Sequence, residues 1–171
     1  KSNKPITNST NNLEDWIIER IKESVDAHLL SDVELGTYLS GGLDSSLVAT
    51  LAAKKAQNLL AFTGYYKIND WYDERSLARE VAKNANIKLH EVEITPSDFM
   101  KHFDELIYTL EEPRMGMGTF SQFIVAKEVA KYRKVVLSGN GGDELFAGYS
   151  NMRAANFFDS FSFASLADLT S

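Results

Sequence analysis

The chain has 171 residues, with 18 basic and 24 acidic side chains and a formal net charge of -6 at pH 7. Apolar residues make up 44% and charged residues 25%, which is typical of a folded globular domain rather than a disordered chain. No apolar run approaches the roughly 20 residues of a membrane-spanning helix, and the acidic balance argues against non-specific nucleic-acid binding. The absence of cysteine excludes disulfides, thiolate metal sites and a cysteine nucleophile, and it fits a reducing compartment.

The apolar pattern predicts helices and strands in alternation. We expect Asn12 to cap the first helix and Thr95 to cap a helix that begins with Pro96. Strands that alternate with helices predict an α/β fold, with a parallel sheet covered by helices on both faces. In chain order the predicted elements are helix 13–29, strand 33–39, helix 44–56, strand 59–66, helix 73–85, strand 88–94, helix 96–110, helix 119–132, strand 134–137 and a short helix thereafter.

Three regions are expected along the chain. Residues 1–12 are polar and predicted to be frayed, and residues 13–153 form one folded domain. Residues 154–171 contain four phenylalanines and need a covering surface, either on this domain or in a further C-terminal helical segment. Because the chain begins with Lys1 rather than methionine, we expect it to be a piece of a longer protein.

The first informative motif is SGGLDSS at residues 40–46, where the first predicted strand gives way to a helix. Its glycine pair permits a tight turn, and the free N–H groups of the helix start, together with the serine hydroxyls, suit a phosphate. The motif has no lysine, so it is not the lysine-bearing phosphate loop of many nucleotide hydrolases. Asp44 would repel a phosphate unless a divalent cation lay between them. The alternative is a plain turn with a capping side chain.

The second motif is SGNGGDELFAGY at residues 138–149, which follows the last predicted strand. If the two strands are neighbours in a parallel sheet, both motifs open at the same edge, which is where α/β sheets bind ligands. Asp143 could then face Asp44 across a metal-bound phosphate. Taken alone, this motif also fits a bend with solvated acidic side chains.

Together the two motifs resemble the PP-loop ATP pyrophosphatase superfamily and, within it, the synthetase domain of glutamine-hydrolysing asparagine synthetases. The resemblance covers about residues 29–149, with further matches at residues 72–74, 80–82, 90–92 and 112–113. It implies an adenine nucleotide alpha hydrolase-like three-layer sandwich in a cytoplasmic enzyme that uses ATP and Mg²⁺. Such an enzyme adenylates a substrate carboxylate such as aspartate, releases pyrophosphate, and transfers ammonia from a glutaminase domain. A homodimer is left open.

The resemblance also implies residue roles. Asp44 and Asp143 hold the metal and, with Asn140, form the catalytic set, while Glu144 fixes the second loop. Leu39 and Gly64 contact the adenylate through backbone atoms. The expected nucleotide-binding residues are Leu39, Ser40, Gly41, Gly42, Leu43, Asp44, Ser45, Ser46, Gly64, Ser138, Gly139 and Gly142.

Asn140 departs from the family pattern, which has glutamate at this position. An asparagine side chain forms hydrogen bonds but cannot accept a proton at neutral pH. Two interpretations therefore stay open: an amidotransferase for another carboxylate, and a nucleotide-binding module without chemistry. Arg114 is a candidate clamp for the acceptor carboxylate, or part of a solvated loop. The catalytic lysine of the family has no matching position in this chain.

Overall fold

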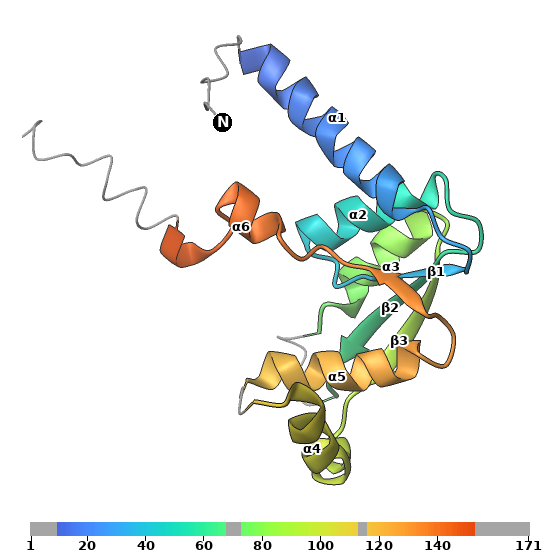
Figure 1. Cartoon of the computed structure of the whole chain (residues 1–171), viewed down its shortest axis with the longest axis vertical. Helices are drawn as coiled ribbons and strands as arrows, with labels where there is room; N and C mark the ends of the chain where they lie inside the picture. Colours follow the sequence, from blue (N-terminus) through green and yellow to red (C-terminus); the bar gives the residue numbers. More distant parts are fainter. Residues whose placement is uncertain (1–9, 68–72, 113–115, 153–171) are drawn as a thin grey trace, which may run out of the picture. The chain divides into compact units, whose positions relative to one another are not determined.

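The computed structural model describes residues 10–67, 73–112 and 116–152 (Figure 1). The chain divides into two compact units, Lys1–Ser138 and Gly139–Ser171, and each is described by itself. The first unit contains every element except the last. In order, the elements are α1 (Thr10–His28), β1 (Leu35–Tyr38), α2 (Leu43–Ala53), β2 (Leu60–Tyr65), α3 (Arg75–Asn84), β3 (Lys88–Glu93), α4 (Pro96–Leu110), α5 (Met117–Val129), β4 (Val135–Leu137) and, in the second unit, α6 (Gly142–Phe146).

The four strands form one parallel sheet in the order β3-β2-β1-β4. Strand β1 lies in the middle, with Thr37 opposite Ala61 of β2 and Leu137 of β4. The carboxyl ends of β1 and β4 therefore lie side by side at one edge of the sheet. Ser40 and Ser138, the first residues of the two motifs, follow these strand ends, as the sequence predicted.

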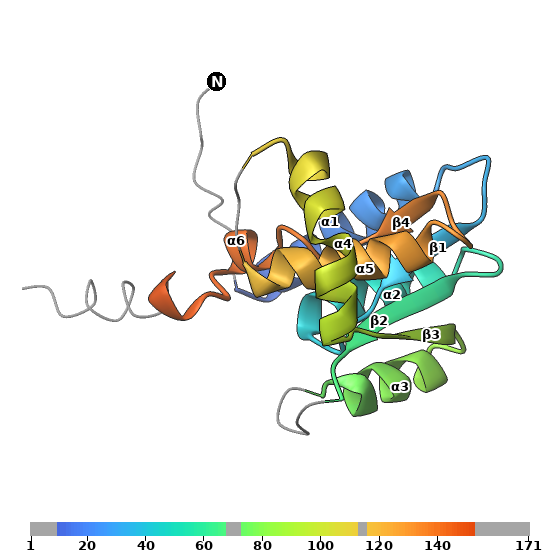
Figure 2. The same ribbon diagram turned by 90° about the horizontal axis from the view of Figure 1, so that it is seen from below.

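Helices cover both faces of the sheet, which confirms the predicted three layers (Figures 1 and 2). Successive residues of a strand point to opposite faces. Ala61 of β2 accordingly packs in a cluster with residues of α1, α2 and α3, whereas Leu60 and Phe62 pack in a second cluster with α4 and α5. Phe62 is 1% exposed and Ala61 is fully buried, so β2 is the centre of the core.

Several predicted boundaries need correction. Helix α1 begins at Thr10, so Asn12 lies inside the helix and is not its cap. Val25 near its C-terminal end is buried, whereas Leu13 and Trp16 near its start are 37% and 47% exposed. Among the described elements, α1 packs mainly against α2.

Helix α5 begins at Met117, two residues before the predicted start, and therefore includes Gly118. Glycine at the start of a helix costs less than in its middle, because the first N–H groups have no intrahelical partner in any case. The cap at Thr95 is confirmed: its hydroxyl accepts from the Asp98 N–H, and the Asp98 carboxylate accepts from the Thr95 N–H at 2.8 Å. Across the described ranges, no helix is long and apolar enough to cross a membrane.

Candidate functional site

The first motif makes a tight turn between β1 and α2. Leu39 is buried, and its N–H donates to the carbonyl oxygen of Phe62 at 2.9 Å, so the chain stays attached to the sheet up to this residue. The turn itself is at Gly41, whose φ of +85° is the left-handed region that favours glycine. A Cβ at Gly41 would lie 2.5 Å from Cβ of Leu77 and 2.8 Å from the backbone nitrogen of Ala78. Only glycine therefore fits, for two independent reasons.

Serine hydroxyls close this loop internally. The Oγ atoms of Ser40 and Ser45 are 3.0 Å apart, and the N–H of Gly42 donates to the Ser40 Oγ at 3.1 Å. The Ser45 hydroxyl donates to the carbonyl oxygen of Gly42 at 3.2 Å and accepts from the Ser40 N–H at 3.3 Å. These bonds form a consistent cycle if the Ser40 hydroxyl donates to Ser45. The loop is thus shaped before any ligand arrives.

The start of α2 presents free hydrogen-bond donors. No side chain caps this helix, and its first backbone bond runs from the Ser46 N–H to the Gly42 carbonyl oxygen at 3.0 Å. In the part of the chain that the structure describes, the N–H groups of Leu43, Asp44 and Ser45 have no acceptor. Three such donors and the positive end of the helix dipole suit an anion.

Two further side chains of this loop lack partners among the described residues. The Asp44 carboxylate is half-buried and forms no hydrogen bond or ion pair there. The Ser46 hydroxyl is buried and has no hydrogen-bond partner. A carboxylate beside an anion-binding turn fits a bound cation that also contacts the anion, which is the arrangement Mg²⁺ prefers with phosphates.

The second motif forms the start of the second unit. Gly141 has a φ of +96°, and α6 begins at the next residue. The Tyr149 hydroxyl donates to Oε1 of Glu144 at 2.6 Å. This hydrogen bond lowers the pKa of the Glu144 carboxyl and raises the pKa of the Tyr149 hydroxyl. This hydrogen bond links Tyr149, beyond the C-terminal end of α6, to a side chain within that helix. That Glu144 fixes the loop for a ligand stays a prediction.

This second loop encloses a polar pocket of about 350 Å³, lined by Gly139, Asn140, Gly141, Asp143, Glu144 and Tyr149. The Asp143 side chain lies against the backbone of Gly148, where a Cβ would be only 1.9 Å from Oδ1 of Asp143. The N–H of Gly148 also donates to the Asp143 carbonyl oxygen at 3.0 Å. Gly148 therefore sets where the Asp143 carboxylate can lie. Gly148 stands in the second motif, but its spacing there did not indicate this role.

The predicted ligand contacts of Leu39 and Gly64, and the metal shared by Asp44 and Asp143, stay predictions. Leu39 uses its N–H within the sheet, which leaves its carbonyl oxygen for a ligand. The backbone of Gly64 is exposed, but a Cβ there would lie 2.7 Å from Val125, so close packing of α5 also explains this glycine. Asp44 and Asp143 belong to different units, so their shared metal stays a prediction.

The described residues leave one predicted residue untested and contain no ready-made metal site. Arg114, the candidate carboxylate clamp, lies outside the described residues. Within 10–67, 73–112 and 116–152, no group of three or more histidine, aspartate or glutamate side chains is arranged to hold a metal ion.

Comparison with known proteins agrees with this geometry. The sequence profile described as asparagine synthase matches residues 17–169. The chain belongs to the asparagine synthase family. It is 31% identical over 150 residues to asparagine synthetase [glutamine-hydrolyzing] 1 of Bacillus subtilis (strain 168), a match that covers 88% of this chain and 24% of that protein. It is 30% identical over 151 residues to amidase chyE of Penicillium rubens, covering 80% of this chain and 22% of that protein.

This asparagine synthase-family chain thus spans about a quarter of the length of these relatives. Among solved structures, the NMN synthetase of Francisella tularensis superposes with a TM-score of 0.50 at 20% identity, covering 83% of this chain and 59% of that chain. At that identity the likeness concerns the fold alone. It supports the adenine nucleotide alpha hydrolase-like fold that the sequence predicted.

Proposed function

We propose that this chain is the ATP-binding part of an amidotransferase-type synthetase that adenylates a substrate carboxylate. The first loop, residues 40–46, receives the pyrophosphate portion of ATP. A carboxylate oxygen of the acceptor attacks the α-phosphorus, and the bond to the bridging oxygen of the β-phosphate breaks. Pyrophosphate leaves with that electron pair. Ammonia then attacks the acyl carbon, and AMP leaves.

The observation that carries this proposal is the start of α2. Among the described residues, three N–H groups lack acceptors and Asp44 has no partner, and the Ser40 and Ser45 hydroxyls already shape the loop. Together these features suit a polyphosphate with a cation. Binding to a preformed cradle costs little reorganisation, which is how fixed dipoles stabilise charge that develops on a leaving group. Membership of the asparagine synthase family supports the same substrate.

Mg²⁺ fits the donor set of this site. Asp44 and Asp143 are the side chains we assign to it, because both are carboxylates within the two loop motifs and Mg²⁺ takes one or two carboxylates with phosphate oxygens. Bound there, Mg²⁺ would neutralise charge on the departing pyrophosphate. Gly148 leaves room for the Asp143 carboxylate, and the Tyr149 hydroxyl donates to the neighbouring Glu144.

The acceptor is a small carboxylate, and Asn140 bears on which one. Asn140 lines the polar pocket of the second loop, where a hydrogen-bonding amide orients an acceptor without taking its proton. This composition favours an acceptor other than aspartate, and an amidase among the relatives is consistent with a broader acceptor range. We further propose that nitrogen comes from glutamine through a glutaminase domain elsewhere in the whole protein, as the name of the Bacillus relative suggests.

A direct test measures Mg²⁺-dependent binding of ATP and of pyrophosphate to the intact protein by calorimetry. Asp44→Asn should weaken both by at least about tenfold, because it removes the charge that the cation needs. Asp32→Asn is the matched control, since Asp32 is an exposed acid before β1, at the opposite edge of the sheet. Binding that is indifferent to both magnesium and Asp44 would contradict the proposed site.

The second candidate is a nucleotide-binding module without chemistry, which Asn140 favours because it removes a proton acceptor. Exchange of labelled pyrophosphate into ATP separates the two, since exchange requires reversible adenylation of a carboxylate. The intact protein would be assayed with a panel of amino-acid and hydroxy-acid carboxylates. Exchange with one acceptor supports the synthetase. Magnesium-dependent ATP binding without exchange for any acceptor supports the module.

A further inference from the structure

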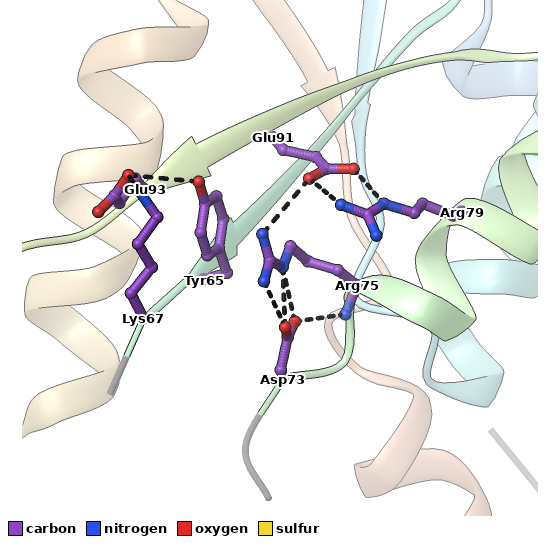
Figure 3. Close-up of polar contacts among 7 residues, drawn as sticks. All are labelled: Tyr65, Lys67, Asp73, Arg75, Arg79, Glu91 and Glu93. Carbon is purple, nitrogen blue, oxygen red and sulfur yellow. Dashed lines mark hydrogen bonds and ion pairs between the residues drawn. The ribbon is translucent and has the colours of Figure 1, made fainter. Parts of the chain in front are cut away.

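A network of ion pairs joins the start of α3 to the ends of β2 and β3, and Figure 3 shows its side chains. We call Asp73, Arg75, Arg79 and Glu91 the α3 network. Asp73 and Glu91 lie within stretches that resemble the family, but the resemblance implied no role for them. The network lies within the first unit, at the carboxyl edge of the sheet where the first loop also begins.

Arg75 is held on three sides. Its Nε and Nη2 donate to the Asp73 carboxylate at 2.8 and 2.5 Å, and its guanidinium lies over the Tyr65 ring, 3.7 Å from the centroid. Asp73 also accepts the backbone N–H of Arg75 at 3.0 Å. Asp73 therefore fixes the first turn of α3 and turns the guanidinium onto the last residue of β2 (Figure 3).

Arg79 ties the next turn of α3 to β3. Its Nε and Nη2 donate to the two carboxylate oxygens of Glu91 at 2.6 and 2.7 Å, which is the bidentate geometry that gives arginine pairs their directional strength. Nη1 of Arg75 lies 3.8 Å from the same carboxylate. Glu91 is thus shared by two turns of one helix, and α3 cannot slide along the sheet without breaking these contacts.

Helix α3 packs directly against the turn of the first loop. Leu77 and Ala78 lie between Arg75 and Arg79 in sequence, and they are the residues that a Cβ on Gly41 would strike. Ala78 is fully buried. The left-handed turn at Gly41 therefore rests directly on the backbone of α3, and its position depends on where that helix lies.

We propose that Arg79 and Glu91, with Asp73 and Arg75, are positioning residues for the pyrophosphate loop. They fix α3, the backbone of α3 fixes Gly41, and Gly41 sets the direction of the N–H groups at the start of α2. This inference rests on the proposed function. Displacements of about 1 Å are enough to lose much of the affinity of a preformed site, so the network acts at a distance without touching the ligand.

The test uses Glu91→Gln in the intact protein, which keeps the side-chain size and removes the charge that both arginines contact. Magnesium-dependent pyrophosphate affinity should fall about tenfold, in the range of coupling between packed neighbours. Affinity for AMP, which lacks the β- and γ-phosphates, should change less than about threefold. Glu105→Gln is the matched control: Glu105 of α4 accepts from Lys127 of α5 at 2.7 Å, and these helices pack in the other core cluster, away from α3.

Further substitutions at Arg79 distinguish loss of positioning from misfolding. Arg79→Gln should lower the pyrophosphate affinity about as much as Glu91→Gln, because it removes the other half of the bidentate pair. Arg79→Lys, which keeps a positive charge beside Glu91, should restore part of that affinity. Equal losses for AMP and pyrophosphate, or an equal loss in Glu105→Gln, would overturn the positioning role and leave the proposed function standing. Absence of magnesium-dependent pyrophosphate binding in the unmodified protein would overturn the proposed function itself, and this inference with it.

Discussion

The two glycine-rich loops have similar compositions but are supported in different ways. The first loop is shaped by the hydroxyls of Ser40 and Ser45 and rests on α3, an element more than thirty residues further along the chain. The second loop is held by contacts among its own residues, namely Tyr149 with Glu144 and Gly148 with Asp143. The first loop therefore depends on the packing of the sheet domain, and the second depends on local hydrogen bonds.

This difference gives each glycine a separate physical role. Gly41 is required twice, by its left-handed φ and by the backbone of α3 beside it. Gly148 is required because the Asp143 carboxylate occupies the space of a Cβ. Gly42 has an extended backbone, and a Cβ there would meet only the Ser40 Oγ, at 3.2 Å. Substitutions at these positions should therefore have unequal effects, which tests the comparison directly.

The largest effect is expected for Gly41→Ala. Left-handed strain and overpacking against Leu77 and Ala78 together should lower the free energy of unfolding by roughly 2–5 kcal/mol. Magnesium-dependent ATP binding should be lost in whatever protein still folds. Urea unfolding followed by circular dichroism measures the first effect and calorimetry the second.

The control for that substitution is its neighbour. Gly42→Ala should cost under about 1 kcal/mol, since alanine is only a poorer helix cap there. If the two substitutions proved equally harmful, the first loop would not rest on α3 in the manner described. If Gly41→Ala left the free energy of unfolding unchanged, Gly41 would not adopt the left-handed conformation described for this turn.

A smaller and more selective effect is expected for Gly148→Ala in the second loop. The new Cβ would lie 1.9 Å from Oδ1, 2.9 Å from Cγ and 3.3 Å from Cα of Asp143. The whole Asp143 side chain must therefore change rotamer, at a cost of about 1–2 kcal/mol. Magnesium-dependent ATP affinity should nevertheless fall by about 10- to 100-fold, as when a group that orients a metal ligand is removed. Stability and affinity would thus separate, unlike in Gly41→Ala.

Gly141→Ala provides the converse case for Gly148→Ala. A Cβ at Gly141 meets no atom within 4 Å, but its φ of +96° is strained for alanine. This variant should lose about 1–2 kcal/mol of stability and leave the Asp143 carboxylate where it is. Unchanged magnesium dependence of ATP binding in Gly148→Ala would show that binding does not depend on the position of the Asp143 carboxylate beside Gly148.

Low pH should break the ion pairs of the α3 network and so destabilise the helix on which the first loop rests. Hydrogen bonds from Arg75 lower the pKa of Asp73 from its ordinary 3.8 to about 2, and Arg79 likewise lowers the pKa of Glu91. A group whose pKa is lowered by folding stabilises the protein above its ordinary pKa, and this contribution disappears as pH falls through the folded value. Thermal unfolding midpoints should therefore drop between about pH 4 and pH 2, and less steeply in Asp73→Asn, which should already be slightly less stable at pH 7. Parallel curves for the two proteins would contradict this assignment.

The order of elements could be predicted from sequence because each signal is local. The capping pattern at Thr95 and the glycine turn at Gly41 depend on residues within one turn, and the structure confirms both. The strand ends at β1 and β4 also meet at one edge, as parallel topology requires. The asparagine synthase family followed from the two motifs for the same reason.

What the sequence could not provide is the packing between distant segments. Arg79 and Glu91 are twelve residues apart, and nothing in their spacing says that they pair or that α3 supports Gly41. Likewise, Val25 of α1 is buried whereas Leu13 and Trp16, at the same helical spacing, are 37% and 47% exposed. Burial depends on what lies opposite a helix face, and that is a property of the fold.

The smallest effect is expected for Tyr149→Phe, which removes one hydrogen bond from the second loop. Because Glu144 is exposed, water replaces much of that bond, and ATP affinity at pH 7 should fall by less than about threefold. The pKa of Glu144 should rise when the Tyr149 donor is lost, since that bond is the main cause of its lowered value. Glu144 of the variant then protonates at a higher pH, so the difference in affinity from the unmodified protein should widen as pH falls from 7 toward 4. Tyr108→Phe, at a tyrosine that is 86% exposed on α4, should show neither change. A loss that is the same at every pH would mean that Tyr149 contributes packing rather than control of the Glu144 charge.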